Sequence, residues 1–413
     1  MTPVKRNLTA KVDSLLQMFP VVVIVGARQC GKTTIAKLAR PDWKYFDLEN
    51  AATYDQISHD YNFFFQNHKE AIIIDEFQLL PDMFKELRGI IDMYPDMNNR
   101  YILTGSSSFE LLNNISESLP GRVAIVELET LKMNETYEQS LPNLYNIFNN
   151  KINLQTTKTL HELKITLTRK QVEQSLLAGG YPKPVLSNNH GFFQQWMDNY
   201  FKTYINRDIR SLFPRLNIVN YRRLILMLSS LSGSMVNKAE IARSLETSEV
   251  TVKEYIDIAH GSFIWRNLFS YESSNMRSLV KMPKGYFRDT GLSNYLRRID
   301  NIDDLYSYPY VGIAFESFVI EELLKGLEAT MQTNWDYRYY RTRNGAEIDL
   351  LLTGSFGILP IEIKFGMNTK LKQLTTLNSF IKDNNLPLGI VINFSNTIEQ
   401  ISETIVQIPV SLI

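Results

Sequence analysis

A short run of small and polar residues from Gly26 to Thr34 has the residue types and spacing that bind a polyphosphate. It reads G-A-R-Q-C-G-K-T-T, contains the pattern G-x-x-x-x-G-K-T, and follows an apolar β-branched stretch, V-V-V-I-V. The glycines permit the backbone to curl so that its N–H groups point inward at phosphate oxygens. A strand before this pattern and a helix after it favour a phosphate-binding loop over an accidental glycine-rich turn.

Individual residues of this loop have expected roles. Lys32 would reach the β- and γ-phosphates, Thr33 would place its hydroxyl on Mg²⁺, and the helix beginning near Lys32 would point its positive end at the anion. The phosphate-contacting residues are predicted to be Gly26, Ala27, Arg28, Gln29, Cys30, Gly31, Lys32, Thr33 and Thr34.

Two acidic residues, Asp75 and Glu76, end a second apolar run, A-I-I-I-D-E. Asp75 would hold Mg²⁺ directly or through water, and Glu76 would polarise the attacking water. By itself this pattern equally describes an acidic turn after a core strand, but a phosphate loop in the same domain favours the catalytic interpretation. A third apolar run, Y-I-L, ends in T-G-S-S-S, which places a hydroxyl of Thr104 or Ser106 where it would sense the γ-phosphate.

The segments G-A-R-Q-C-G-K-T-T, I-I-I-D-E-F-Q, I-L-T-G-S-S and L-P-G-R together resemble the AAA-type ATPase core of a prokaryotic family. In that family the ATPase is fused to a C-terminal domain resembling restriction nucleases. The resemblance implies binding of ATP and ADP with Mg²⁺, and hydrolysis of ATP. Arg122, in L-P-G-R, is then a candidate arginine finger acting in the same chain or on a neighbouring copy in a homo-oligomer. A surface salt bridge is the alternative role for Arg122.

Acidic residues near the C-terminus occur in the element order of the PD-(D/E)xK nucleases. Glu316 lies on a predicted helix and Asp349 on a predicted strand, A-E-I-D-L-L-L. Glu362 and Lys364 follow in the strand L-P-I-E-I-K-F and point the same way, since strand residues two apart share a face.

The nuclease resemblance gives these residues a chemistry. Glu316, Asp349 and Glu362 would gather oxygen ligands around Mg²⁺ or Mn²⁺. Lys364 would orient or activate water for attack on a phosphodiester of DNA or RNA. Amphipathic strands with one solvent-exposed face have the same residue pattern without any catalytic role. The nuclease scaffold also occurs as a catalytically inert module, which would here bind a protein partner.

The elements that would position these residues divide into four segments. Residues 1–135 alternate strands and helices, which is the α/β pattern of a parallel sheet and the predicted AAA-type P-loop core. Residues 136–215 are predicted to form a linker and a helical lid, 216–285 a winged-helix-like unit, and 286–413 the α/β restriction-nuclease-like domain. The polar, Asn- and Thr-rich part from 134 to 168 is predicted to be a long loop.

The predicted lid contains Gly180-Tyr181-Pro182, which resembles the G-x-P element that signal-transducing ATPases place against the adenine. Pro182 would contact the base and ribose with little ordering cost, because its ring already restricts φ. The alternative is that these residues only end one helix and begin a turn.

The winged-helix prediction comes from K-A-E-I-A-R-S-L-E, T-S and E-V-T-V-K-E-Y-I-D-I-A, followed by a strand-like segment. The second helix, residues 248–260, carries three acidic side chains and one lysine. A helix that enters a DNA groove lies among phosphates, so an acidic one favours a structural or protein-contact module.

Composition narrows the class of protein. A chain of 413 residues predicts two to four domains, and 44 basic against 44 acidic residues create no global attraction to nucleic acid or to an anionic membrane. The single cysteine, Cys30, excludes an intrachain disulfide and a cysteine metal cluster. Without a signal-peptide core or a bilayer-spanning apolar run, the expectation is a cytoplasmic protein with no membrane association.

Overall fold

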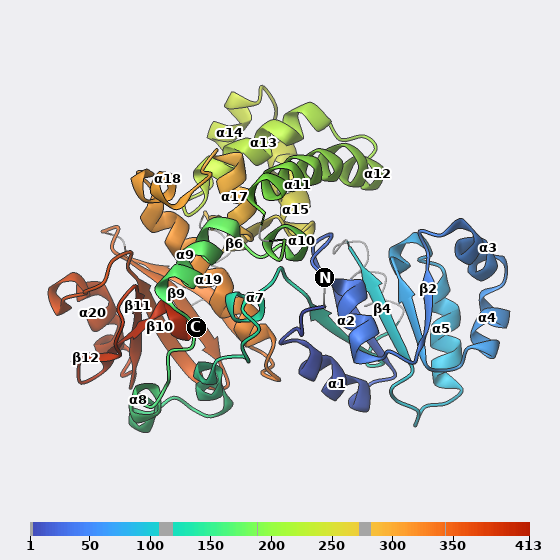
Figure 1. Cartoon of the computed structure of the whole chain (residues 1–413), viewed down its shortest axis with the longest axis horizontal. Coiled ribbons are helices and arrows are strands. Elements are labelled where there is room, and N and C mark those ends of the chain that lie inside the picture. Colours follow the sequence, from blue (N-terminus) through green and yellow to red (C-terminus); the bar gives the residue numbers. More distant parts are fainter. Residues whose placement is uncertain (1–2, 107–118, 188, 272–281, 343) are drawn as a thin grey trace. The chain divides into compact units, whose positions relative to one another are not determined.

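The chain folds into two compact units. The computed structural model describes residues 3–106, 119–187, 189–271, 282–342 and 344–413 (Figure 1). Ser107 and Ser108 of the third motif lie outside these residues. The N-terminal unit comprises residues 1–131 with 261–263 and 328–331, and the C-terminal unit comprises 132–260, 264–327 and 332–413.

A five-stranded parallel sheet forms the centre of the N-terminal unit (Figure 1). Its strand order is β2-β3-β4-β1-β5. The three inner strands are buried along their whole length, as expected for a parallel sheet covered on both faces. The predicted α/β fold with a parallel sheet is therefore confirmed. The strands are β1 (Val21–Val25), β2 (Lys44–Asp47), β3 (Ile72–Asp75), β4 (Tyr101–Gly105) and β5 (Val123–Glu127).

Strand register brings the motifs to one edge of this sheet. Asp75 pairs in register with Thr104, and Thr104 pairs with Ile24 near the end of β1. Because all these strands are parallel, the loop after β1 emerges at the same edge as both side chains. The helices around the sheet are α1 (Thr9–Met18), α2 (Lys32–Ala39), α3 (Ala51–His59), α4 (Tyr61–Asn67) and α5 (Met83–Asp92), with the 3₁₀ turn η1 (Phe77–Leu79).

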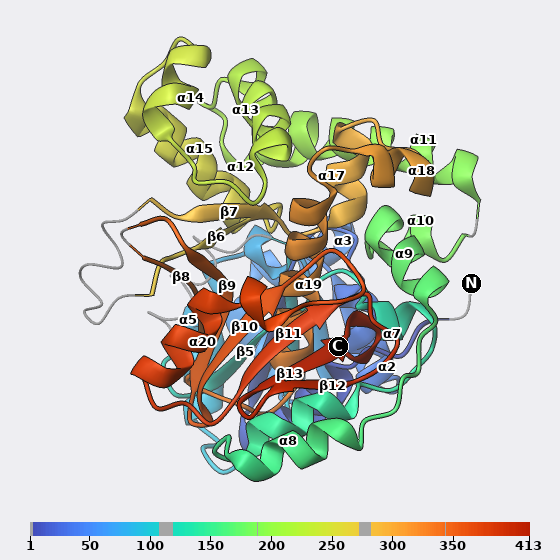
Figure 2. The same cartoon turned by 90° about the vertical axis from the view of Figure 1, so that its left-hand side faces the viewer.

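A six-stranded mixed sheet, of order β12-β13-β11-β10-β9-β8, forms the C-terminal unit's largest core. Figure 2 shows helix α19 (Val311–Glu328) on one side and α20 (Thr375–Asp383) on the other. Apolar side chains of α19 and α20 belong to separate buried clusters on the two faces. The strands are β8 (Asp336–Arg341), β9 (Glu347–Gly354), β10 (Gly357–Ile363), β11 (Gly389–Asn393), β12 (Glu399–Ser402) and β13 (Ile405–Pro409), with 3₁₀ turns η4 (Leu371–Gln373) and η5 (Val410–Leu412).

Helices make up the middle of the C-terminal unit. Three of them, α13 (Ile218–Leu231), α14 (Lys238–Ser244) and α15 (Glu249–Gly261), precede an antiparallel pair, β6 (Trp265–Leu268) and β7 (Lys284–Phe287). This is the element order expected of a winged-helix-like unit, and that assignment stays a prediction. The other helices are α9 (Arg169–Ala178), α10 (Pro182–Val185), α11 (His190–Thr203), the π-helical η3 (Tyr204–Ile209), α12 (Arg210–Leu212), α17 (Thr290–Leu296) and α18 (Ile302–Ser307). Across the described residues, no helix has both the length and the apolar character needed to cross a membrane.

The long loop predicted for residues 134–168 is wrong, because this segment is folded into the core. It contains the helices α7 (Met133–Thr136) and α8 (Leu154–His161) and the 3₁₀ segment η2 (Asn143–Asn149). Tyr145 and Phe148 are 2% exposed, and both belong to the buried cluster that includes α19. The apolar residues of η2 stand among asparagines, so composition alone indicated a loop, whereas tertiary packing determines the structure.

Truncation of Phe148 tests whether this segment is structural. We expect Phe148→Ala to lower the free energy of unfolding by about 3–5 kcal/mol, since a buried aromatic ring is lost from the core. Leu154→Ala, at a side chain that is 68% exposed, is the control and should stay within about 0.5 kcal/mol of wild type. Urea denaturation followed by tryptophan fluorescence measures both variants. If both substitutions leave the free energy of unfolding nearly unchanged, the segment behaves as a loop.

Candidate functional site

The loop between β1 and α2 is tightly packed at its first glycine. A Cβ placed on Gly26 would lie 2.0 Å from the Leu128 carbonyl oxygen, so no larger residue fits there. Gly31 caps α2 with φ +104°, a conformation that favours glycine. Both glycines of G-x-x-x-x-G-K-T are therefore required by the backbone.

Lys32 directs its ammonium group back into the loop. Its side chain is buried, and Nζ donates hydrogen bonds to the carbonyl oxygens of Gly26 at 3.1 Å and Ala27 at 2.9 Å. The positive charge thus lies within the curl of the backbone, where it would meet the phosphates of a nucleotide.

Asp75 is the centre of a buried hydrogen-bond network at the edge of the sheet. Its Oδ2 accepts from the Thr33 hydroxyl at 2.6 Å and from the Tyr45 hydroxyl at 2.8 Å. Its Oδ1 accepts from the Thr104 hydroxyl and from the Glu76 backbone N–H at 3.1 Å. Burial and the neighbouring Asp75 raise the pKa of Tyr45, so Tyr45 stays a hydrogen-bond donor. This network brings Thr33, Asp75 and Thr104 together at the ends of neighbouring parallel strands.

Glu76 is held beside Asp75 by a different pair of donors. Its backbone adopts φ +54°, which is left-handed, and its Oε2 accepts from the Ser106 hydroxyl at 3.0 Å and from the amide of Gln78. Gln78 also donates to Ser106 at 3.3 Å. Side chains of its own unit therefore hold Glu76 in one orientation, as a residue that polarises water would require.

Arg6 is a structural residue of the loop that sequence analysis missed. Its buried guanidinium donates to the carbonyl oxygens of Cys30 at 2.8 Å and Glu129 at 2.7 Å. The thiol of Cys30 also donates to the Leu128 carbonyl at 3.3 Å, and burial raises its pKa. The chain after β5 thus braces the phosphate loop. No local pattern around Arg6 marks this role, since its partners lie far away in the sequence.

Arg122 lies at the opposite edge of the sheet from the phosphate loop of its own chain. It precedes Val123, which pairs in register with Val21 at the start of β1, whereas the loop follows the other end of β1. A strand of this length spans about 16 Å. Arg122 forms an ion pair with Asp92 and lowers the pKa of that carboxyl group. Arg122 thus forms the salt bridge that was the alternative interpretation, and its action as an arginine finger stays a prediction.

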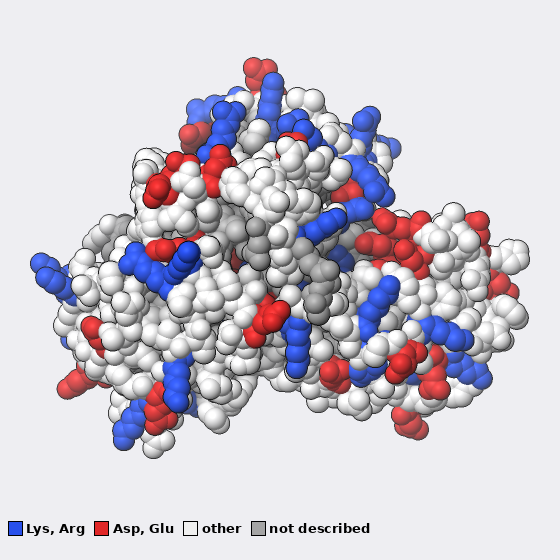
Figure 3. All heavy atoms as spheres, in the orientation of Figure 1, with Lys and Arg blue, Asp and Glu red and all other residues white. Residues whose placement is uncertain are grey.

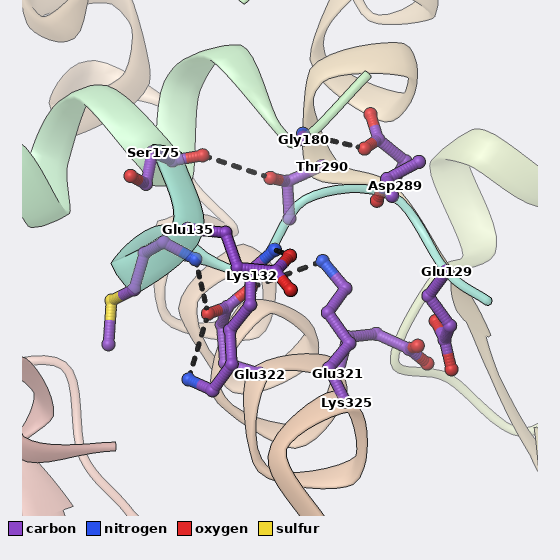
Figure 4. Close-up of polar contacts among 12 residues, drawn as sticks. Glu129, Lys132, Glu135, Ser175, Gly180, Asp289, Thr290, Glu321, Glu322 and Lys325 are labelled. Carbon is purple, nitrogen blue, oxygen red and sulfur yellow. Dashed lines mark hydrogen bonds and ion pairs between the residues drawn. The ribbon is translucent and has the colours of Figure 1, made fainter. Parts of the chain in front are cut away.

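The Gly179–Pro182 region belongs to the C-terminal unit and packs against α17. The Gly180 N–H donates to Asp289 at 2.8 Å (Figure 4). A Cβ on Gly179 would lie 2.3 Å from the Asp289 carboxylate. Pro182 begins α10, so this region ends one helix and starts another, as the alternative interpretation expected. Contact between Pro182 and a nucleotide stays a prediction.

A second group of acidic residues lies in the C-terminal unit. Asp349 on β9 accepts a hydrogen bond from the Ile363 N–H at 2.7 Å, and Glu362 on β10 pairs with Lys364 at 2.5 Å. The other oxygen of Glu362, Oε2, is buried and makes no hydrogen bond. Burial and then Asp349 raise the pKa of Glu362 to about 8 and that of Glu316 to about 7. Burial also raises the pKa of Asp349.

Strand β7 supplies two residues to this group that sequence analysis missed. The Tyr286 hydroxyl donates to Glu316 at 2.6 Å, and Lys284 lies 3.5 Å from Glu316 and 2.6 Å from Glu347. Although burial disfavours the ammonium, the nearby carboxylates raise the pKa of Lys284 above its usual value. Lys284 and Tyr286 lie 32 and 30 residues before Glu316 in the sequence, so no local spacing indicated the contact.

The metal centre expected at Glu316, Asp349 and Glu362 is not preformed. Among the described residues, no three His, Cys, Asp or Glu side chains are arranged to hold a metal ion. The three carboxylates still influence one another's pKa, and Glu316 is occupied by Tyr286 and Lys284.

Buried ion pairs hold helix α19, which carries Glu316. Glu322 accepts from Lys132 at 3.2 Å and from Lys325 at 3.1 Å (Figure 4). Glu321 forms a bidentate pair with Arg266 of β6, at 2.6 and 3.0 Å. Because each buried charge has a partner, α19 is fixed to β6 and to the chain before α7.

Sequence comparison agrees with the geometry of the N-terminal unit. Residues 18–137 match the family described as an AAA domain. Residues 169–303 and 311–413 match two families that are each described as a domain of unknown function, DUF8612 and DUF4143. With the parallel sheet, the glycine loop and the Asp75 network, this match defines the N-terminal unit as a P-loop ATPase domain of the AAA type.

Two mycobacterial proteins resemble most of the chain. These are the uncharacterized proteins Rv2008c of Mycobacterium tuberculosis and Mb2031c of Mycobacterium bovis. Each is 31% identical over 363 residues, which cover 87% of this chain and 74% of the relative. The chain therefore belongs to the same family as these two proteins.

Solved structures show only distant likeness. The Walker-type ATPase PABY2304 of Pyrococcus abyssi is 15% identical with a TM-score of 0.43, and the match covers 72% of this chain and 99% of that one. The signal transduction ATPase PH0952 of Pyrococcus horikoshii, which has a tetratricopeptide repeat sensor, is 13% identical with a TM-score of 0.28, over 79% of this chain and 49% of that one. At these scores the resemblance is partial.

The raised pKa of Glu362 predicts a pH-dependent stability. Between its ordinary value of 4.5 and about 8, the folded chain keeps a proton that the unfolded chain has released. The free energy of unfolding should therefore fall as pH rises, and this contribution is complete below 4.5 and lost above about 8. Glu362→Gln should flatten the profile measured by urea denaturation, and the exposed-site variant Glu399→Gln should not. Identical slopes for Glu362→Gln and wild type would contradict the raised pKa.

Proposed function

We propose that this protein hydrolyses ATP and that its nucleotide state controls the C-terminal unit, which cuts or binds nucleic acid with the help of Mg²⁺ or Mn²⁺. The observation that carries the proposal is the network around Asp75. It joins the helix after the phosphate loop, through Thr33, to the ends of two neighbouring strands.

The residues at the edge of the parallel sheet suit Mg²⁺ and ATP. A hydroxyl and a carboxylate 2.6 Å apart, from Thr33 and Asp75, are oxygen donors of the kind that Mg²⁺ takes, and these two would hold it. The ion would neutralise charge on the phosphates. Lys32 would bind the β- and γ-phosphates, Glu76 would orient water, and Thr104 would respond to the γ-phosphate through its bond to Asp75.

The acidic group of the C-terminal unit supports the nucleic-acid part of the proposal. One oxygen of Glu362 pairs with Lys364, but the other is buried without a hydrogen-bond partner, and such an oxygen is costly unless a proton or a further cation satisfies it. Glu316, Asp349 and Glu362 would hold Mg²⁺ or Mn²⁺, and Lys364 would position water or a phosphate oxygen.

A second candidate function is a nucleotide-gated scaffold whose nuclease-like domain is inert and binds a protein partner. The contacts of Lys284 favour it, because this buried ammonium already neutralises Glu316 and Glu347. A cation supplied by the chain itself satisfies carboxylates that would otherwise attract a metal ion.

Substitution of Glu76 tests ATP hydrolysis. We expect Glu76→Gln to bind ATP with wild-type affinity and to hydrolyse it about 10²- to 10⁴-fold more slowly, since the residue that activates water is lost. Lys32→Ala should not bind ATP. Phosphate release and binding of a fluorescent ATP analogue measure the two properties. The exposed α5 variants Glu86→Gln and Lys85→Ala are matched controls and should behave as wild type. Wild-type turnover in Glu76→Gln would contradict the assigned role.

Substitution of Asp349 tests the C-terminal site. We expect Mn²⁺ to bind the full-length chain in calorimetry and Asp349→Ala to abolish that binding, because a buried oxygen ligand is removed. Asp383→Ala, at the exposed end of α20, removes the same charge and should leave binding unchanged. Labelled DNA and RNA incubated with Mg²⁺ or Mn²⁺ report cutting. Metal binding without cutting would favour the scaffold, and no metal binding at all would exclude the site.

A further inference from the structure

Positive charge is concentrated in one part of a chain that is neutral overall. Residues 201–245 contain eight of the 44 Lys and Arg residues but only two of the 44 Asp and Glu residues. Six of the eight are arginines, and all six are exposed. We call them the basic belt: Arg207, Arg210, Arg215, Arg222, Arg223 and Arg243.

The belt runs over helices that touch one another. Arg222 of α13 lies over the ring of Phe201 of α11, 5.9 Å from its centre, and the hydroxyls of Tyr204 and Tyr221 are 2.9 Å apart. On the other side of α13, the Asn220 amide donates to the Leu245 carbonyl just after α14 at 3.3 Å. Figure 3 shows basic side chains gathered over the positions of α12, α13 and α14 in Figure 1. The arginines therefore lie on helices that pack against one another within one unit.

The chemistry of the belt suits a phosphate backbone. Arginine presents a planar fork that binds phosphate oxygens in pairs. The exposed polar side chains Asn206, Ser211 and Ser244 donate to backbone carbonyl oxygens three or four residues earlier, so the phosphate contacts are assigned to the arginines. The aromatic residues Phe201, Tyr204 and Tyr221 are buried beneath the surface, whereas the aliphatic side chains Leu212, Val219 and Leu226 are exposed near the arginines, so the test below includes phospholipid vesicles.

We propose that the basic belt is a nucleic-acid-binding surface that holds the phosphate backbone of a duplex without reading its bases. Helix α15, the expected recognition helix, exposes Glu249, Glu254 and Asp257 and is not part of this surface. The proposal deepens the proposed function by naming the surface that holds the nucleic acid. It requires neither ATP nor a metal ion, so it can fail or succeed independently.

The test is fluorescence anisotropy of the full-length chain with labelled 30-base-pair DNA, duplex RNA and single strands, in EDTA and without nucleotide. The triple variant Arg210→Gln, Arg223→Gln, Arg243→Gln should bind duplex about 10- to 100-fold more weakly at 0.1 M salt. Log affinity falls linearly with log salt concentration, and the steepness of this slope should decrease by about 2–3 in the triple variant. Each lost phosphate contact makes the slope shallower by a little under one. The DNA and RNA arms show which backbone is preferred.

Matched variants separate this effect from a general loss of charge or fold. Lys151→Gln, Lys158→Gln, Lys164→Gln removes three exposed charges elsewhere in the same unit and should keep the affinity and the slope. Arg210→Lys, Arg223→Lys, Arg243→Lys should restore the salt slope. The proposal is overturned if both Gln variants bind alike, if wild type binds no nucleic acid, or if the belt instead binds phosphatidylglycerol vesicles.

Discussion

The carboxylate of Asp75 is buried at the end of β3, and the N-terminal unit is arranged so that this charge has donors. Its partners come from α2, β2 and β4, through Thr33, Tyr45 and Thr104. An ionised carboxylate without such partners would destabilise the fold by several kcal/mol, at about 1–3 kcal/mol or more for each unsatisfied group. The same requirement gathers three hydroxyl groups around one carboxylate, and the proposed binding of Mg²⁺ and nucleotide uses oxygen atoms of this group.

In the C-terminal unit, not every buried carboxylate oxygen has a hydrogen-bond donor or a cation beside it. Glu321 and Glu322 of α19 are fully paired with Arg266, Lys132 and Lys325, and they hold the helix in place. Glu362, in contrast, keeps a buried oxygen without a donor, and its pKa is raised to about 8. Paired carboxylates fix a structure, whereas a partly paired one is available for a proton or a cation. This difference separates Glu321 and Glu322 from Glu362, whereas Glu316 of the candidate site already contacts Lys284 and Tyr286.

Sequence patterns were informative where the residues that come together lie at the ends of neighbouring parallel strands. The phosphate loop, Asp75 and Thr104 come together because parallel strands present their carboxyl ends at the same edge. Sequence patterns were insufficient where strand direction or tertiary packing determines the position of a residue. Arg122 precedes its strand and so lies at the far edge, and the asparagine-rich segment around Phe148 is buried because α19 offers it an apolar surface.

The sequence by itself determined the nucleotide loop, the α/β core and the order of the acidic strands, since these depend on local spacing and on backbone rules that hold in any fold. Only the tertiary structure decided that Arg6 braces the loop, that Tyr45 binds Asp75 and that Lys284 and Tyr286 contact Glu316. The partners of Arg6, Lys284 and Tyr286 lie on separate elements, joined by no periodicity. Burial of charge selects such contacts, and burial is a property of the whole fold.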